Sequence, residues 1–440
     1  MAPFGAERAD QVERDGRAKS AGRAETSGRA ETSERAEPAE RAKSAERSES
    51  AGRAEGAGQA GQAERVEERN GSDRTAPDAA PTGAVGAART VWLAIGLLVA
   101  LLGALTAAVA LGATDIAPAE VWSVVFRRLG GEPPRPGTDD LIVWQLRVPR
   151  ALLAALVGAG LGLVGTATQA LVRNPLADPY LLGISNGASL GAVAAIVLGA
   201  GAMAGTGGVF GAGGTFGLGG GVGLSLAAFT GALASFALVW TLARRGGGFA
   251  PLRLVLAGVG IGQFLAGFTS YLVLQAGDEQ QTRGVLFWLM GSLGGATWGT
   301  LVLPALAVPA GLLVLQARAR ALNALTMGDE TAASVGVDVV RLRRTLFVVT
   351  SLLTGVLVSV SGAVAFVGLM VPHLCRLIVG GDHRRLLPLA ALTGALLLVV
   401  VDIVCRTAMD TQELPVGVVT ALIGAPVLLY VLDRRLGGGT

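Results

Sequence analysis

The sequence predicts an all-α polytopic membrane protein, and three observations carry that prediction. The chain of 440 residues is 51% hydrophobic, only 16% of it is charged, and long apolar runs recur from residue 90 onward. Its mean hydropathy is +0.54. A bilayer is crossed by about 20 apolar residues in a helix, and soluble proteins rarely carry many such runs. Cys375 and Cys405 lie inside apolar segments, so neither a disulfide framework nor a metal-ligand spacing is expected.

Residues 1–89 differ in composition from the membrane domain predicted over 90–435. They hold 15 of the 36 lysines and arginines and 17 of the 33 acids, and arginine recurs at every sixth position from 17 to 53. A six-residue step spreads these arginines over three directions around a helix. With almost no large apolar side chains, the segment cannot offset its ordering entropy, so we expect a disordered cytoplasmic tail. The tail is either a tether or regulatory arm, or an extension without a role in the membrane domain.

Ten membrane spans are predicted after the tail. They lie near 91–111, 151–171, 183–200, 222–242, 252–274, 301–316, 345–360, 362–379, 387–408 and 416–432. The seventh and eighth are separate spans, because residues 345–375 are uncharged and too long for one crossing at about 1.5 Å per residue, and Ser359, Ser361 and Gly362 interrupt the run. Basic clusters flank the pair on both sides and favour a hairpin with both ends in the cytoplasm: Arg341, Arg343 and Arg344, and Arg376, Arg384 and Arg385.

The distribution of arginine places both termini of the membrane domain in the cytoplasm. Residues 90–440 contain 21 arginines and no lysine, and 14 of these arginines fall in the loops that this orientation makes cytoplasmic. Five of the remaining seven share the outer loop 112–150: Arg127, Arg128, Arg135, Arg147 and Arg150.

The start of the second span raises a problem of charge. Pro149 favours the first turn of a helix there, between Arg147 and Arg150. Cations at a helix N-terminus oppose the helix dipole, so the two arginines are expected to have a compensating partner.

The chain is not expected to be an enzyme. A phosphate-binding loop of the G-x-x-x-x-G-K type cannot exist without lysine, and the chain has only 2 histidines. Asp402 is the one acid well inside a predicted span, and Arg406 follows four residues later, which favours a helical ion pair. A proton relay through Asp402 is the alternative, because acids inside a membrane are commonly functional.

Three segments of the chain resemble the FecCD family, the permease subunits of bacterial type II ABC importers for iron-siderophores and cobalamin. The first, residues 147–192, reads RVPRALLAALVGAGLGLVGTATQALVRNPLADPYLLGISNGASLGA. The second is TMGDETAASVGVDVVRLRR, residues 326–344. The third, residues 361–432, begins SGAVAFVGLMVPHLCRLIVGGDHRRLLPLA and ends TQELPVGVVTALIGAPVLLYVL.

The resemblance implies a dimer, of identical or homologous permease subunits with ten helices each, around a central translocation pathway. Two separate cytoplasmic ATPase subunits would hydrolyse ATP with Mg, so this chain itself would bind no cofactor. A substrate-binding protein would dock on the extracytoplasmic side of the plasma membrane, and lipid would surround the subunit. No nucleic-acid partner is expected. Transport would proceed by alternating access.

The resemblance also assigns roles to residues at the two membrane surfaces. Outside, Arg147, Arg150 and Arg406 would contact carboxylates of the binding protein, for which arginine is well suited. Binding of lipid phosphates is the alternative for these arginines. Inside, Asn174 and Leu176 of the N-P-L stretch would form part of a cytoplasmic gate.

A second gate strip is expected between the fourth and fifth spans, at Pro251 and Leu252. Cobalamin-type members carry small hydroxyl residues there, whereas this chain reads FAPLR. The departure favours a siderophore as substrate. Gln263, Thr269, Ser270 and Tyr271 of the fifth span either line a substrate path or hydrogen-bond to other helices.

Residues 326–341 resemble the cytoplasmic coupling helices that insert into the ATPase. Asp329 is expected to cap a short helix, and Gly336 to take the left-handed position that ends it. Asp338 would open a second short turn. The residues assigned to coupling are Gly328, Asp329, Glu330, Ala333, Gly336 and Val337; the alternative is an ordinary solvated loop.

The predicted function is therefore permeation of a ferric siderophore in an ATP-driven importer, with cobalamin or heme as the alternative substrate. Two other classes remain open: a proton-coupled secondary transporter that uses Asp402, and a receptor or structural protein that uses the tail as an interaction arm.

Overall fold

The computed structural model describes residues 82–112, 116–133, 138–202, 220–244, 250–277, 279–409 and 412–437. The predicted tail lies outside the described residues, apart from 82–89. Those eight residues correct the predicted boundary, because they form the first two turns of a helix that begins at Thr82. Alanine-rich sequence next to a formed span adds a hydrogen bond for each residue ordered, so the helix extends backward from the apolar run.

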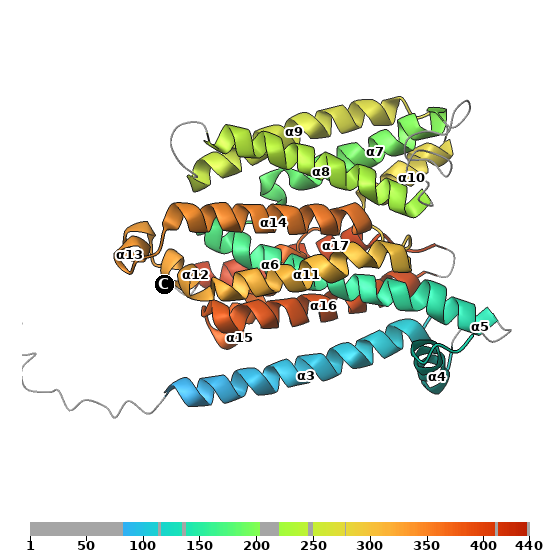
Figure 1. Cartoon of the computed structure of the whole chain (residues 1–440), viewed down its shortest axis with the longest axis horizontal. Coiled ribbons are helices and arrows are strands. Elements are labelled where there is room, and N and C mark those ends of the chain that lie inside the picture. The colour runs from blue at the N-terminus through green and yellow to red at the C-terminus, as the bar shows by residue number, and fades with distance from the viewer. Residues whose placement is uncertain are drawn as a thin grey trace, which may run out of the picture. The chain divides into compact units, whose positions relative to one another are not determined.

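All regular elements in the described residues are helices (Figure 1). The long helices are α3 (Thr82–Ala110), α6 (Val148–Val172), α7 (Ile184–Ala202), α8 (Gly220–Arg244), α9 (Pro251–Leu274), α11 (Trp298–Ala317), α14 (Val339–Ser361), α16 (His383–Thr407) and α17 (Val416–Gly437). The shorter ones are α4 (Pro118–Leu129), α5 (Thr138–Leu141), α10 (Glu279–Leu289), α12 (Ala319–Thr326), α13 (Asp329–Ser334) and α15 (Val367–Val379). A π-helical turn, η1 (Ile142–Arg147), precedes α6, and a 3-10 turn, η2 (Pro179–Leu182), precedes α7.

Each of the ten predicted spans coincides with one of these helices. In the described residues, seven helices are long and apolar enough to cross a membrane, and α7, α15 and α17 contain shorter apolar stretches. Ten crossings therefore remain a prediction, whereas a multi-pass helical protein is observed. The predicted break in the long uncharged run is confirmed: α14 ends at Ser361, and Gly362 takes a φ of 65°.

Helix α6 forms the centre of the bundle, with most of its side chains buried among α11, α14, α15 and α16 (Figure 1). Glycines at the helix contacts are what allow this packing. A Cβ at Gly158 would collide with the carbonyl of Gly394, and one at Gly162 with that of Ala390, so α6 and α16 approach backbone to backbone. At the edge of the bundle, Gly258 of α9 packs in the same way, against the backbone of Leu181.

Pro149 lies in the first turn of α6, as predicted, but that turn is not a free helix start. Helix α5, η1 and α6 follow one another without a gap, so the proline lies inside a longer helical rod. Proline has no backbone N–H, so one helical hydrogen bond is missing at position 149. The π-helical turn just before Pro149 accommodates this missing bond. Trp298 of α11 donates its indole N–H to the carbonyl of Trp144 in that turn, at 2.9 Å.

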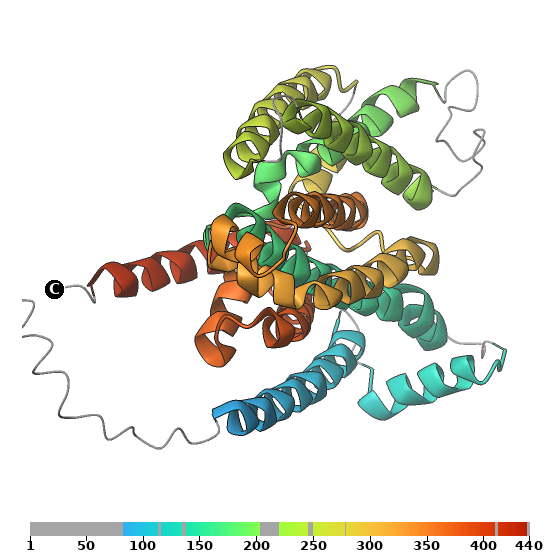
Figure 2. The ribbon, with the colours of Figure 1, turned by 60° about the vertical axis from the view of Figure 1, so that its left-hand side comes forward.

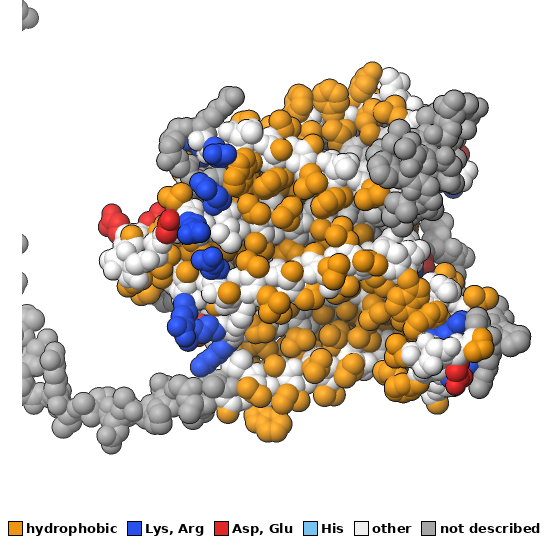
Figure 3. Space-filling model, viewed as in Figure 1, with side chains coloured by type: hydrophobic (Ala, Val, Ile, Leu, Met, Phe, Trp, Pro, Cys, Tyr) orange, Lys and Arg blue, Asp and Glu red, His pale blue; other side chains and the backbone are white. Residues whose placement is uncertain are grey.

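The bundle has two distinct ends. The first residues of α3, the short helices α12 and α13 and the C-terminal end of α17 lie at one end, which we call the α13 end. Helices α4 and α5 lie at the other end, which we call the α4 end (Figures 1 and 2). On the face shown in Figure 3, arginine side chains gather mainly at the α13 end, and hydrophobic side chains cover the middle.

Candidate docking and gating sites

Arg147, at the α4 end, serves as a cap for the last turn of α3. Its Nη1 donates to the carbonyls of Val109 and Ala110, both at 2.9 Å. The residue is only 8% exposed. The last carbonyls of a helix have no partner within the helix and carry the negative end of its dipole, which a guanidinium satisfies.

Arg406, from the far end of the sequence, reaches the same helix terminus. Its Nη2 donates to the carbonyl of Ala108 at 2.8 Å and its Nη1 to that of Leu111 at 3.2 Å. Two arginines from different helices therefore fix the end of α3 against α6 and α16. This is the compensation that the sequence required for Arg147.

Asp402 lies between two arginines in the interior. Its side chain is 0% exposed, and Oδ1 accepts from Nε of Arg150 at 2.9 Å. Nε of Arg406 lies 3.1 Å from Oδ2, close enough for an ion pair although the angle is outside hydrogen-bond alignment. The pair predicted between Asp402 and Arg406 forms, and Arg150 joins it.

Glu413 completes a cluster at the α4 end, the side predicted to face outward. We call it the outer arginine cluster, and it consists of Arg147, Arg150, Asp402, Arg406 and Glu413. Its carboxylate pairs with Nη1 of Arg150 at 2.9 Å, and its side chain is 46% exposed. Sequence reasoning did not single out Glu413, which lies on the segment between α16 and α17. The only feature of the sequence that could have pointed to Glu413 was its position as an acid outside the predicted spans.

The cluster gathers the three arginines that were assigned to docking, but each has partners within the chain. The side chains of Arg150 and Arg406 are 12% and 8% exposed. An external carboxylate would therefore have to exchange with an internal one, and Glu413 is the exposed carboxylate in the cluster. The docking role itself stays a prediction.

Asp329 does not cap α13, which corrects the sequence prediction. The residue before the helix is Gly328, with a φ of 121° and no side-chain cap, and Asp329 is the first helical residue. Its carboxylate instead accepts from Nη2 of Arg343 at 2.7 Å and lies 3.5 Å from Nη1 of Arg173. Two guanidiniums from other elements attract the carboxylate more strongly than a local amide does.

The end of α13 follows the prediction, and the segment after it does not. Gly336 has a φ of 84°, the left-handed conformation that was expected. Asp338 caps α14 directly by accepting from the amide of Arg341 at 2.9 Å, so the expected second short turn is the first turn of a long helix. Glu330 and Ala333 are exposed and Val337 is half-buried, so α13 presents a solvent-facing surface.

Arg173 connects the first gate strip, at Asn174 and Leu176, with Asp329. Arg173 ends α6 in the left-handed conformation, with a φ of 55°. In the next turn the Asn174 side chain accepts from the amide of Leu176 at 2.9 Å, and Leu176 is 41% exposed. The structure thus links the predicted coupling helix and gate turn through one ion pair.

The second strip is separate from this arrangement. Pro251 occupies the first turn of α9, where its missing N–H costs nothing, and Leu252 is 70% exposed. Further along α9, Thr269 and Ser270 bond to carbonyls of their own helix, and the hydroxyl of Tyr271 accepts from Gln275. These bonds are local, so they do not decide between the two roles left open for the α9 polar residues.

The gate turn is anchored in the bundle at its far side. The Tyr180 hydroxyl accepts from the amide of Val364 at 2.6 Å, in the break between α14 and α15. Asp178 accepts from the amide of Tyr180 at 2.7 Å, and burial raises the pKa of the Asp178 carboxyl. These contacts hold one side of the turn, which leaves Asn174 and Leu176 as its exposed side.

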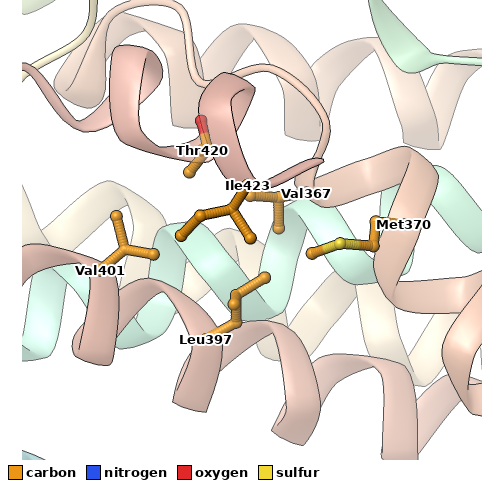
Figure 4. A pocket seen from close by; sticks show the side chains of 6 residues that line it. All are labelled: Val367, Met370, Leu397, Val401, Thr420 and Ile423. Carbon is orange, nitrogen blue, oxygen red and sulfur yellow. The ribbon is translucent and has the colours of Figure 1, made fainter. Parts of the chain in front are cut away.

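A crevice between α15, α16 and α17 does not provide a substrate path within one subunit. It is lined by Val367, Met370, Leu397, Val401, Thr420 and Ile423, five of them apolar (Figure 4). No water-sized space remains between these side chains. Among the described residues, no group of three or more His, Cys, Asp or Glu could hold a metal ion.

Comparisons with known proteins agree with this architecture. Residues 97–434 match the FecCD transport family. The cobalamin import system permease protein of Halobacterium salinarum is 43% identical over 68% of this chain and 75% of its own length. The hemin transport system permease protein of Yersinia pestis is 40% identical over 78% of this chain and 96% of its own length.

A solved structure, described as an inward-facing conformation of an ABC transporter assigned to the metal-chelate type, has a similar fold. Its TM-score is 0.65 at 27% sequence identity, over 78% of this chain and 99% of that one. The match to the family covers far more than half of the chain, and the relatives are permeases of import systems. The chain belongs to the FecCD transport family, as a permease of the type II ABC importer class.

Proposed function

We propose that this permease imports a metal chelate, and that a ferric siderophore is the first candidate. The observation that supports the class is the resemblance in sequence and fold to permeases named for cobalamin and hemin and to a transporter of the metal-chelate type. All these cargoes are large, rigid metal complexes. An importer with this fold therefore has to open a wide path, which a pair of subunits can provide at their common axis.

The choice among chelates rests on weaker support. The Pro251–Leu252 strip departs from the small hydroxyl residues of cobalamin-type members and favours a siderophore. The names of the relatives favour cobalamin or heme. These two substrates stay as the alternative, because specificity in such systems lies largely in the binding protein.

The proposed machine pairs the chain with a second permease, two ATPase subunits and a binding protein. The exposed surface of α13 supports ATPase docking at the α13 end, which we assign to the cytoplasm together with both termini. The outer arginine cluster supports docking of the binding protein at the opposite end. The α9 face that carries Leu256, Phe264 and Tyr271, each 57–62% exposed, is large enough to contribute to a subunit contact.

Reconstitution in vesicles tests the substrate directly. The chain would be combined with candidate ATPase and binding-protein partners, and ATP hydrolysis would be followed while a ferric siderophore, cobalamin or heme is supplied in turn. We expect stimulation and uptake with the ferric siderophore. Stimulation by cobalamin or heme alone would replace the siderophore, and no response to any of the three would overturn the metal-chelate proposal.

Coupling is tested by Gly336→Pro at the end of α13. Proline cannot adopt a φ of 84°, so the substitution should displace the surface that docks on the ATPase. We expect loss of ATPase co-purification or of stimulated hydrolysis. Ser334→Ala, at an exposed position of the same helix that is not assigned to coupling, is the matched control. Unchanged co-purification and hydrolysis in the Gly336 variant would contradict the assignment.

Docking outside needs a variant that leaves the buried ion pairs intact. Charge reversal at Arg147 and Arg150 would break the cluster itself, so we choose Glu413→Cys followed by a bulky maleimide. We expect loss of hydrolysis stimulated by the binding protein, with basal hydrolysis retained. The parent chain, whose two cysteines are buried, is the control for the reagent. Full stimulation after complete labelling would place docking elsewhere.

The alternative classes give different results. A proton-coupled carrier would take up substrate in response to a pH gradient without ATP, whereas an importer would not. The two guanidiniums that hold Asp402 favour a structural ion pair over a proton relay. An interaction protein that relies on the tail would fail after deletion of residues 1–81, and an importer would keep working. That deletion ends just before α3 begins.

A further inference from the structure

Helix α4 carries an apolar surface that nothing in the proposed transport cycle uses. This helix of 12 residues runs from Pro118 to Leu129, and Gly130 follows as its cap. Val121 and Val124 point into the core, each 2% exposed. Trp122, Phe126 and Leu129 are instead 39%, 65% and 71% exposed, which is unusual for large apolar side chains on an outer loop.

The exposed apolar residues occupy one arc of the helix. At about 100° per residue, Trp122, Phe126 and Leu129 fall within roughly 60° of one another. The rings of Trp122 and Phe126 are stacked with centroids 5.5 Å apart. These side chains form a continuous aromatic and aliphatic ridge, separate from the arc that packs on the core.

A third arc of the same helix is polar. Glu120, Ser123 and Arg127 fall within another arc of roughly 60°, about 120° from the ridge. Glu120 and Ser123 are exposed, and Arg127 is half-buried. The helix therefore has three faces: one packs on the protein core, one is apolar and exposed, and one is polar and exposed. This pattern is typical of a helix at a boundary between lipid and water.

Ion pairs fix how α4 is rotated about its axis. Nη2 of Arg128 lies 2.6 Å from Asp140 and Nη2 of Arg127 lies 3.3 Å from it, and Asp140 is 4% exposed. Asp140 precedes the η1 turn, so both charges at the end of α4 are held against the helical rod that continues as α6. The apolar ridge therefore cannot turn inward without breaking two ion pairs.

The direction of α4 matches a position in the plane of the membrane. Figure 1 shows α4 along its axis while α3 and α16 run across the page, and Figure 2 shows it from the side. Its axis therefore crosses those of the candidate spans, at their outer rim. Along α3, Val99 and Leu102 are 64% and 49% exposed, and Leu111, directly after the helix, is 42% exposed, so exposed apolar surface reaches the loop before α4.

We propose that α4 lies in the outer interface of the membrane, with Trp122, Phe126 and Leu129 inserted at the level of the lipid headgroups and Glu120 and Ser123 in water. Tryptophan and phenylalanine suit this depth, because their rings favour the boundary region. The helix would then hold the loop between α3 and α6 at a fixed height above the bilayer. The inference does not depend on which substrate is imported.

Site-directed spin labelling in vesicles of phosphatidylcholine and phosphatidylglycerol tests this position. A nitroxide would be attached to Phe126→Cys or Leu129→Cys on the ridge and, as matched controls on the same helix, to Glu120→Cys or Ser123→Cys. Collision with oxygen reports lipid, and collision with a water-soluble nickel chelate reports water. Val99→Cys on α3 is the reference for the bilayer interior, and the parent chain with buried cysteines is the blank.

We expect oxygen to collide with the labels at 126 and 129 severalfold more than the nickel chelate does, and the reverse at 120 and 123. The ratio at 126 should be smaller than the ratio at 99, because the interface is shallower than the bilayer interior. Two results would overturn the proposal: labels at 126 and 129 as accessible to nickel as those at 123, or labels shielded from both reagents, as a protein partner on the ridge would cause. Each label lies at an exposed position, so an unchanged melting temperature verifies the fold.

Discussion

The two ends of the bundle hold their charges in opposite ways. At the α4 end, Asp402 is fully buried between Arg150 and Arg406, and two arginines satisfy the carbonyls that end α3. At the α13 end, Asp329 is 40% exposed and reaches Arg343 and Arg173 from a helix of six residues. The charges at the α4 end hold helices together, whereas those at the α13 end orient a small surface. Buried pairs are costly to break, and exposed pairs contribute little to stability.

The largest effect is expected from Asp402→Ala. It leaves two buried guanidiniums without their carboxylate, which should cost about 3–5 kcal/mol in the free energy of unfolding. Thermal unfolding of the purified chain in detergent measures the change, with Glu413→Ala as the matched removal of a carboxylate from the same cluster. Equal losses of stability in the two variants would show that the burial of Asp402 does not raise the cost of removing its carboxylate.

Arg147→Ala should have the next largest effect, confined to α3. Losing the charged donor to Val109 and Ala110 should cost about 2–3 kcal/mol, and the last turn of α3 should open first. Hydrogen exchange of the amides near Ala110 reports this opening. Arg147→Lys keeps the charge and should recover part of the protection. If α3 exchanges as slowly in the alanine variant as in the parent, Arg406 alone is sufficient as a cap.

Asp329→Asn should change stability by about 1 kcal/mol or less, because its pairs are partly exposed. Its effect should appear in coupling, since the carboxylate links α13 to Arg173 beside the gate turn. We expect weaker stimulation of ATP hydrolysis by substrate with normal ATPase co-purification, measured against Ser334→Ala. Normal stimulation would mean that the link between Asp329 and Arg173 carries no signal.

Glu413→Gln should have the smallest effect on stability, a few tenths of a kcal/mol up to about 1 kcal/mol. Its side chain is 46% exposed and can still accept a hydrogen bond from Arg150. If Glu413 competes with a carboxylate of the binding protein, the variant should bind that protein more tightly. Surface plasmon resonance on the reconstituted complex measures the affinity, and weaker binding would show that Glu413 itself takes part in docking.

Local patterns predicted much of the fold correctly. Each of the ten predicted apolar runs coincides with a helix, and in the described residues seven helices are long and apolar enough to cross a membrane. The break after Ser361 and the left-handed Gly336 were also predicted, because each depends on a few neighbouring residues. Pro149 was placed correctly in the first turn of α6, but no short pattern signalled the π-helical turn that joins α6 to the helix before it.

The residue partners were predicted less well, for a physical reason that the arginines illustrate. Arg150 and Asp402 are 252 positions apart, and Arg147 reaches carbonyls 37 and 38 positions earlier. Asp329 was assigned to the nearest amide, but two distant guanidiniums were stronger partners. Charge and spacing along the chain do not encode which helices will meet.

The sequence by itself determined that this protein is a helical membrane permease, because hydropathy, the bias of arginine and the three family segments are all local or additive properties of the chain. Only the tertiary structure decided that the arginines at the α4 end hold the end of α3 and a buried carboxylate, that Glu413 is the exposed member of that cluster, and that α4 has an exposed apolar ridge beside a polar arc. Each of those facts depends on which side chains become buried and which stay exposed. Burial is decided only when helices that are distant in the sequence pack together.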